Sequence, residues 1–287
     1  MIDRLVLHHA TRGQLQSFLA RPSHALLLTG PAGIGKTAIA EALTEGMLGA
    51  SLSSHPYYLA VRPDGSSISI DAIRQMQKFL QLKTTGEKPF RRAVIVEYAH
   101  ALTTEAQNAF LKLLEEPPAD TVMILTANNP RALLPTILSR TQTITVNAPD
   151  EAQLKPILDS SNKSDAERKQ AYFLSGGLPG LLHALLRDEE EHPLLTSVTQ
   201  AKELLQKPTF ERVAMADALS KQKEAALGLV DALERIARAG LNGAASKQDS
   251  ARLKQWHRLR KESLEAKSAL RHNTNAKLVL TNLFINL

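Results

Sequence analysis

Short apolar runs alternate with helix-like segments along the first half of the chain. The apolar runs that indicate strands are 25–29, 57–61, 93–96, 121–126 and 142–146. Apolar residues spaced by three or four positions predict helices at 11–20, 37–48, 71–82, 104–116 and 132–138. Gln107, three residues after Thr104, has the spacing of a capping box. Because strands and helices alternate, we expect an α/β domain with a five-stranded parallel sheet covered on both faces.

Beyond Pro149 the pattern is helical throughout. The segments 153–158, 165–174 and 180–187 predict a small three-helix unit, and further helices are expected at 210–219, 223–239 and 251–271. Lys207-Pro208 indicates a boundary between the two helical parts, because the residue before a proline disfavours helix. The predicted domains are therefore 1–148 (α/β), 149–206 (three helices) and 207–287 (all-helical), the last with an apolar packing seam.

Composition narrows the class of protein. The chain has 287 residues, of which 43% are hydrophobic and 22% charged, as in ordinary globular proteins. It has no Cys, which excludes disulfides and Cys-based zinc sites. The first 20 residues lack the apolar core of a signal peptide, and no apolar run reaches membrane-spanning length. We expect a cytoplasmic protein with no membrane partner.

The positive charge is concentrated at the C-terminal end. Residues 241–287 hold nine Lys or Arg and three Asp or Glu, so the formal net charge of +6 falls in this stretch. One interpretation is a surface for nucleic acid or an acidic partner. The other is a solvated helix face, which is favoured because no aromatic residues are interleaved for base stacking.

The strongest motif lies between the first predicted strand and the helix that follows it. Its eight residues fit G-x-x-x-x-G-K-[ST], the phosphate-binding loop; they are Gly30, Pro31, Ala32, Gly33, Ile34, Gly35, Lys36 and Thr37. Glycines let backbone N–H groups approach phosphate oxygens, and the helix N-terminus favours the same anion. Lys36 would reach the β- and γ-phosphates and Thr37 would hold Mg²⁺. A glycine-rich turn without a ligand is the alternative, but the motif and its flanks favour ATP or ADP with Mg²⁺.

Glu97, at the end of the run 93–96, is the candidate for a second Mg²⁺ contact. Phosphate-loop enzymes place a carboxylate there, although a strand-end acid can also be merely solvated. The next residue often polarises the attacking water, but here it is Tyr98, whose free pKa of about 10 makes it a poor base near neutral pH. The sequence therefore predicts a site that binds ATP and hydrolyses it poorly.

Two further polar residues have two interpretations each. Asn128, just after the fourth predicted strand, could orient a water molecule or a γ-phosphate, or could belong to a simple Asn-Asn-Pro turn. Arg140 follows a short predicted helix and could be a plain surface charge. It could also stabilise the γ-phosphate of a nucleotide bound to another subunit.

Several stretches together resemble the AAA+ clamp-loader ATPases of bacterial DNA polymerase III. The most specific is 106–118, AQNAFLKLLEEPP; the others are 24–28, 69–74, 137–140 and 275–280. The resemblance implies a AAA+ module, a helical lid at 149–206 and a C-terminal collar. It also implies a hetero-pentamer with other clamp-loader subunits, a sliding clamp and primer–template DNA. By position, Asn128 matches sensor 1, and Arg140 matches the arginine finger that acts in trans.

The departures from the family pattern shape the functional prediction. In the motor subunits of the family, an Asp-Glu pair stands where this chain has Glu97 and Tyr98. Those subunits also have a sensor 2 arginine in the lid, where this chain has Gly180. The family's four-Cys zinc module is absent, so no zinc is expected. We expect a subunit that binds nucleotide and lends Arg140 to its neighbour. The alternatives are an active AAA+ motor subunit or remodeller, and a DNA-binding module acting through the basic C-terminal stretch.

Overall fold

The computed structural model describes residues 2–187, 193–246, 248–272 and 274–287. The chain divides into two compact units, residues 1–153 and 154–287. Each unit has its own hydrophobic core, so each is considered separately.

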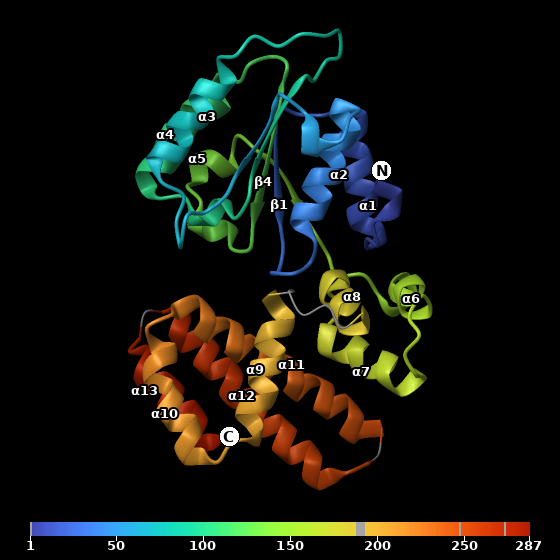
Figure 1. The fold of residues 1–287 in the computed structure, drawn as a ribbon, viewed down its shortest axis with the longest axis vertical. Helices are drawn as coiled ribbons and strands as arrows, with labels where there is room; N and C mark the ends of the chain where they lie inside the picture. The colour runs from blue at the N-terminus through green and yellow to red at the C-terminus, as the bar shows by residue number, and fades with distance from the viewer. Residues whose placement is uncertain (1, 188–192, 247, 273) are drawn as a thin grey trace. The chain divides into compact units, whose positions relative to one another are not determined.

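The first unit is built on a five-stranded sheet, as the sequence predicts (Figure 1). The order across the sheet is β2-β3-β4-β1-β5, and every neighbouring pair is parallel. The strands are β1 (Ala25–Thr29), β2 (Tyr58–Val61), β3 (Arg92–Val96), β4 (Thr121–Ala127) and β5 (Gln142–Thr145). Every residue of β1, β3 and β4 is buried, which explains their continuous apolar runs. The edge strand β5 has only one buried position.

Helices cover both faces of this sheet. In Figure 1, α1 (His9–Ala20) and α2 (Lys36–Leu48) lie on one face, and α3 (Ile70–Leu80), α4 (Thr104–Glu115) and α5 (Pro135–Leu138) lie on the other. The core under α3 and α4 includes Leu27, Ile73, Phe110 and Leu125. Short 3₁₀ turns complete the unit at Ile2–Arg4, Leu52–Ser54, Ala99–Ala101 and Pro130–Ala132.

Two local predictions in this unit are wrong. The helix expected at 132–138 is a 3₁₀ turn followed by the four-residue α5, because Pro135 begins a new turn. The capping box is also absent: Thr103, not Thr104, is the N-cap of α4, and its side chain accepts a hydrogen bond from the Ala106 N–H. Gln107 is therefore one position too far along the helix to complete a capping box, and it faces the interior instead.

The second unit is helical throughout the residues that the structure describes. Its helices are α6 (Glu151–Asp159), whose first turn precedes the unit boundary, then α7 (Asp165–Ser175), α8 (Pro179–Arg187), α9 (Pro193–Gln206), α10 (Thr209–Ser220), α11 (Lys223–Ser246), α12 (Ser250–Arg271) and α13 (Ala276–Asn286). One hydrophobic cluster joins Leu174 of α7 with Leu204, Leu233, Leu270 and Phe284. The predicted lid–collar boundary at Lys207-Pro208 falls between α9 and α10, and the division itself stays a prediction.

The longest helix extends further than its sequence predicts. α11 was expected to end at Ala239, but it continues through Gly240 and Gly243 to Ser246. A Cβ on Gly240 would collide with the indole ring of Trp256 in α12, so the glycine permits close packing of α11 against α12. This packing keeps the helix intact where glycine alone would weaken it.

None of the helices in the described part of the chain combines the length and apolar character that a membrane crossing requires.

Candidate functional site

The predicted nucleotide-site residues of the first unit collect at the carboxyl edge of the sheet. The phosphate loop follows β1, Glu97 follows β3 and Asn128 follows β4. Because β4 pairs with both β1 and β3, it lies between the loop and Glu97. Ligands of open parallel sheets bind at this edge, where the strand order reverses.

The backbone of the phosphate loop takes conformations that glycine allows. Gly30, Gly33 and Gly35 have φ values of 148°, 78° and 93°. A Cβ on Gly30 would lie 2.9 Å from the carbonyl oxygen of Val146, so this position has no space for a larger residue. Gly35 is the left-handed N-cap of α2, so the positive end of that helix begins within the loop.

Lys36 lies within the loop with little exposure to solvent. Its Nζ donates hydrogen bonds to the carbonyl oxygens of Gly30 (2.9 Å) and Pro31 (2.8 Å). Burial lowers its pKa to about 8, because desolvation penalises the ammonium form. An anionic phosphate would supply the counter-charge that these neutral carbonyls lack.

Thr37 and Glu97, the two residues predicted to contact Mg²⁺, lie within hydrogen-bond distance of each other. The Thr37 hydroxyl donates to Oε2 of Glu97 at 3.3 Å, and Glu97 is only 6% exposed. Hydroxyl and carboxylate oxygens are the hard ligands that Mg²⁺ prefers. The donor set therefore fits a magnesium ion carried by nucleotide phosphates.

Arg62, which the sequence analysis missed, also contacts this carboxylate. Its Nε donates to Oε1 of Glu97 at 2.6 Å. Arg62 follows β2, and the pairing of Val61 with Val96 places it beside Glu97. The sequence shows a basic residue directly after the second predicted strand. It could be placed beside Glu97 only once β2 was known to pair with β3.

Tyr98 directly follows Glu97, and it is 46% exposed. It has a left-handed backbone with φ of 54°, which is uncommon for a residue other than glycine. Its N–H donates to the Thr126 hydroxyl at 3.0 Å, and its ring contacts His100 edge to face. The backbone here is thus held in place, and the side chain is a phenol rather than a carboxylate.

Asn128 and Arg140 lie at separate places in the unit. Asn128 is half-buried, and its N–H donates to Nδ1 of His100 at 3.3 Å. Arg140 follows α5, and its Nη2 pairs with Oε1 of Glu115 in α4 at 2.9 Å. Its Nη1 also donates to the Thr136 carbonyl oxygen at 3.1 Å. Among the described residues, no hydrogen bond or ion pair joins Arg140 to the phosphate loop.

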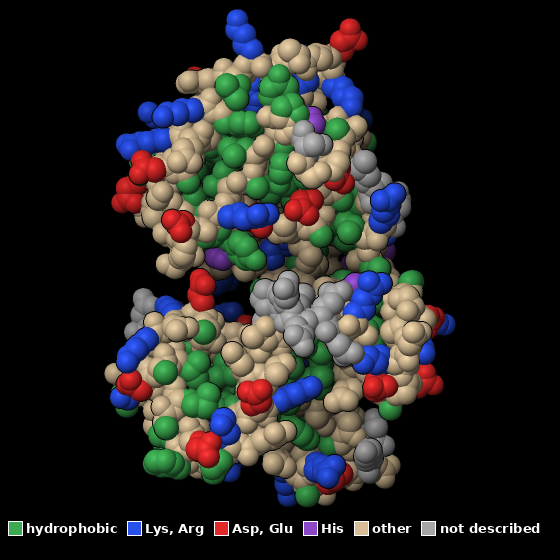
Figure 2. Space-filling model, viewed as in Figure 1, with side chains coloured by type: hydrophobic (Ala, Val, Ile, Leu, Met, Phe, Trp, Pro, Cys, Tyr) green, Lys and Arg blue, Asp and Glu red, His purple; other side chains and the backbone are tan. Residues whose placement is uncertain are grey.

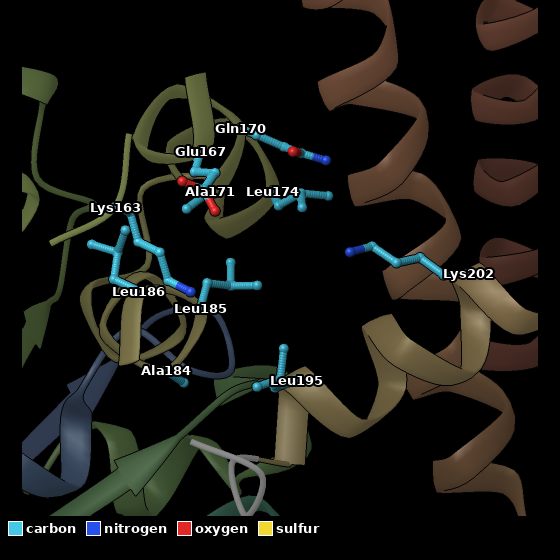
Figure 3. Close-up of a pocket in the computed structure, with 10 residues that line it drawn as sticks. All are labelled: Lys163, Glu167, Gln170, Ala171, Leu174, Ala184, Leu185, Leu186, Leu195 and Lys202. Carbon is cyan, nitrogen blue, oxygen red and sulfur yellow. The ribbon is translucent and has the colours of Figure 1, made fainter. Parts of the chain in front are cut away.

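A separate pocket of about 300 Å³ lies within the second unit (Figure 3). It is formed by α7, α8, α9 and the loop before α7, and it is lined by Lys163, Glu167, Gln170, Ala171, Leu174, Ala184, Leu185, Leu186, Leu195 and Lys202. Gly180, at the predicted sensor 2 position, lies in α8 and does not line it. Six of the ten lining residues are Ala or Leu, and the other four are Lys163, Glu167, Gln170 and Lys202.

The basic C-terminal stretch is largely paired with acids. Lys267 pairs with Asp231, Arg260 with Glu234 at 3.8 Å, and Lys277 with Asp217 at 2.7 Å. Hydrogen bonds from Lys277 and Lys221 lower the pKa of Asp217 to about 2. On the face in Figure 2, basic and acidic side chains of the second unit are interspersed. These pairs favour the solvated-face interpretation.

Within the described residues, no group of three or more His, Cys, Asp or Glu side chains could hold a metal ion. Any metal at the phosphate loop would therefore depend on nucleotide phosphates for further ligands.

Comparisons with known proteins concern mainly the first unit. Residues 11–150 match the family model described as "DNA polymerase III, delta subunit". DNA polymerase III subunit delta' of Pseudomonas aeruginosa is 38% identical over 140 residues, which cover 42% of each chain. The same subunit of Escherichia coli (strain K12) is 30% identical over 189 residues, covering 59% of this chain and 56% of that relative. The chain thus spans about half the length of these curated relatives.

One solved structure resembles nearly the whole chain. A DNA polymerase III gamma subunit-related protein from Thermotoga maritima has a TM-score of 0.50 and 24% identity, covering 94% of this chain and 97% of that chain. This likeness shows the fold alone. Together with the parallel β2-β3-β4-β1-β5 sheet, it confirms the predicted α/β fold with a helical C-terminal region.

Proposed function

Because residues 11–150 match the family model described as "DNA polymerase III, delta subunit", we propose that this protein is a clamp-loader subunit of the delta-prime type. It assembles with other clamp-loader subunits into a hetero-pentamer. The complex loads a sliding clamp onto primer–template DNA in an ATP-dependent reaction during replication.

In this proposal the first unit binds ATP or ADP with Mg²⁺. The observation that carries it is the arrangement of Lys36, Thr37 and Glu97 at the carboxyl edge of the sheet. Lys36 binds phosphate oxygens, the loop N–H groups orient the polyphosphate, and Thr37 and Glu97 hold the metal. Bound Mg²⁺ neutralises phosphate charge. Tyr98 supplies no carboxylate to activate water, so the nucleotide is retained rather than hydrolysed.

Arg140 has the second role in this proposal. It lies away from the chain's own phosphate loop, at the end of α5, and it is 37% exposed. An arginine from one subunit can stabilise charge on the γ-phosphate bound by the next. We therefore assign Arg140 to the neighbouring ATPase, with Glu115 holding its guanidinium before assembly.

A second candidate function is an active ATPase motor subunit. It is favoured by the Thr37–Glu97 contact, which retains the metal-binding half of a hydrolytic site. Asn128, after β4, would act as sensor 1 in that case. The two candidates differ in whether the purified chain alone turns over ATP.

Co-purification from the native host tests the proposal. A tagged copy should bring down clamp-loader subunits in stoichiometric amounts, together with bound nucleotide. Lys36→Ala should retain the protein partners and lose the nucleotide, because Lys36 lies in the first unit's interior rather than on an exposed surface. Isolation of the tagged protein without clamp-loader subunits would contradict the proposal. ATP turnover by the chain alone, abolished in Lys36→Ala, would favour the motor subunit instead.

A further inference from the structure

We propose that Arg62 supplies the positive charge that balances the Glu97 carboxylate. Nucleotide binding to this chain then depends only weakly on Mg²⁺. The inference rests on the proposed nucleotide site and concerns how that site is regulated. It requires that Arg62 and the metal serve the same carboxylate.

The geometry places Arg62 where a metal would otherwise be required. Parallel pairing of β2 with β3 brings the residue after Val61 beside the residue after Val96. The Glu97 N–H donates to the Val61 carbonyl oxygen at 2.9 Å, which fixes this register up to the site. Arg62 Nε then contacts Oε1 of Glu97 at 2.6 Å, while Oε2 accepts from Thr37 at 3.3 Å. Both carboxylate oxygens are therefore engaged before any metal binds.

The surrounding charges explain why a cation is needed there. The Glu97 side chain is 7% exposed, and a buried carboxylate is costly unless it is paired. Glu41 in α2 is a second acid near Glu97. Burial raises the pKa of Glu41, and so does the negative charge of Glu97. The site thus holds two acids, whose negative charge opposes that of a polyphosphate, and Lys36 is the cation that the phosphate loop supplies. Arg62 adds a second positive charge next to Glu97, and its side chain is 62% exposed.

Two consequences follow for a bound nucleotide. A divalent ion beside Thr37 would share the Glu97 carboxylate with Arg62, so its electrostatic gain is reduced by the charge that Arg62 already supplies. When Mg²⁺ is absent, Arg62 continues to neutralise Glu97, and the polyphosphate meets a site that is not strongly negative. Arg62 is a positioning and charge-balancing residue in this proposal, not a catalytic one.

The test is equilibrium binding of a fluorescent ADP analogue to the full chain, in excess Mg²⁺ and in EDTA. We expect the wild-type affinity to change by less than about threefold between the two conditions, because Arg62 balances Glu97 in both. Arg62→Gln removes the charge but keeps a polar side chain, and it should bind at least about tenfold more weakly in EDTA than in Mg²⁺. Arg62→Lys keeps the charge and should behave like the wild type.

Arg74→Gln is the matched control, because Arg74 pairs with Asp71 on an exposed part of α3, away from the loop. It should leave both affinities unchanged. A wild-type affinity that falls more than about tenfold in EDTA would overturn the inference, as would an Arg62→Gln variant indistinguishable from the wild type. Either result leaves the nucleotide site in place.

A third outcome would bear on the proposed function as well. If no variant binds the analogue in either condition, this inference and the nucleotide part of the proposed function both fail. Membership of a clamp loader is then tested separately, by co-purification.

Discussion

Lys36 is the residue whose surroundings show most clearly what the phosphate loop is built to bind. Its ammonium group is buried against two backbone carbonyl oxygens, and burial lowers its pKa to about 8. Carbonyl dipoles only partly compensate a buried cation, whereas a polyphosphate compensates it fully. Ligand binding should therefore raise the Lys36 pKa again and couple nucleotide affinity to pH.

We predict that affinity for ADP falls about tenfold between pH 7 and pH 9, as the free protein loses the Lys36 proton around its pKa of about 8. Fluorescence titrations at a series of pH values measure this directly.

The stability of the unliganded protein should change in the opposite sense. The folded-state pKa lies below the unfolded value, so the unfolded chain binds more protons above pH 8 and this contribution rises with pH. Lys36→Met should weaken binding and abolish the Lys36-dependent part of the pH response, and a wild-type affinity constant across this range would contradict the assignment.

At the scale of elements, the first unit was predictable because its signals are local. β1, β3 and β4 are buried on both faces, so their sequences are unbroken apolar runs. The phosphate loop was predictable for the same reason, since glycines, lysine and threonine lie within eight consecutive residues. The sequence also predicts that Glu97 lies beside the phosphate loop as a candidate Mg²⁺ ligand, because phosphate-loop proteins place a carboxylate at the end of a neighbouring strand.

The features that escaped prediction depend on packing between distant segments. α9 was not predicted: Thr196, Ser197 and Thr199 are poor helix formers, and burial of Val198 and Leu204 against the second core stabilises it. Arg62 required the pairing of β2 with β3, which no local pattern reveals. Gln107 has the spacing of a capping residue, yet its role is set by a segment 25 residues further along the chain.

Gln107 connects α4 to the segment that leads to Arg140. Its side chain is 5% exposed; Nε2 donates to the carbonyl oxygens of Leu102 and Ala132, and Oε1 accepts from the Leu134 N–H at 2.8 Å. Glu115, at the end of the same helix, pairs with Arg140. One helix thus contacts both the residues that precede α5 and the arginine that follows it.

We predict that Gln107→Leu lowers the free energy of unfolding by about 2–4 kcal/mol, because three backbone groups lose their buried partner. Urea unfolding of the full chain measures the change. Asn108→Leu is the matched control, since Asn108 is exposed on the same helix, and it should change stability by less than about 0.5 kcal/mol. Equal losses in the two variants would show that Gln107 is not the connection that the structure indicates.

At the scale of the whole molecule, the proposed function divides the work between two places in the first unit. The phosphate loop, Thr37, Glu97 and Arg62 form a site equipped to bind nucleotide, and Tyr98 removes the acid that hydrolysis needs. Arg140 lies elsewhere, paired with Glu115, and becomes useful only when another subunit presents a nucleotide to it. The second unit, with a core of its own, supplies the predicted lid and collar helices.

The most direct test of this division is the ATPase rate of a reconstituted clamp loader, stimulated by clamp and primed DNA, with Arg140→Ala in this subunit. Arg131→Ala, an exposed arginine in the turn before α5, is the matched control. We predict that Arg140→Ala slows hydrolysis at the adjoining site on the order of a thousandfold, that assembly is unaffected, and that Arg131→Ala behaves as wild type. An assembled complex in which Arg140→Ala hydrolyses ATP at the wild-type rate would contradict the account.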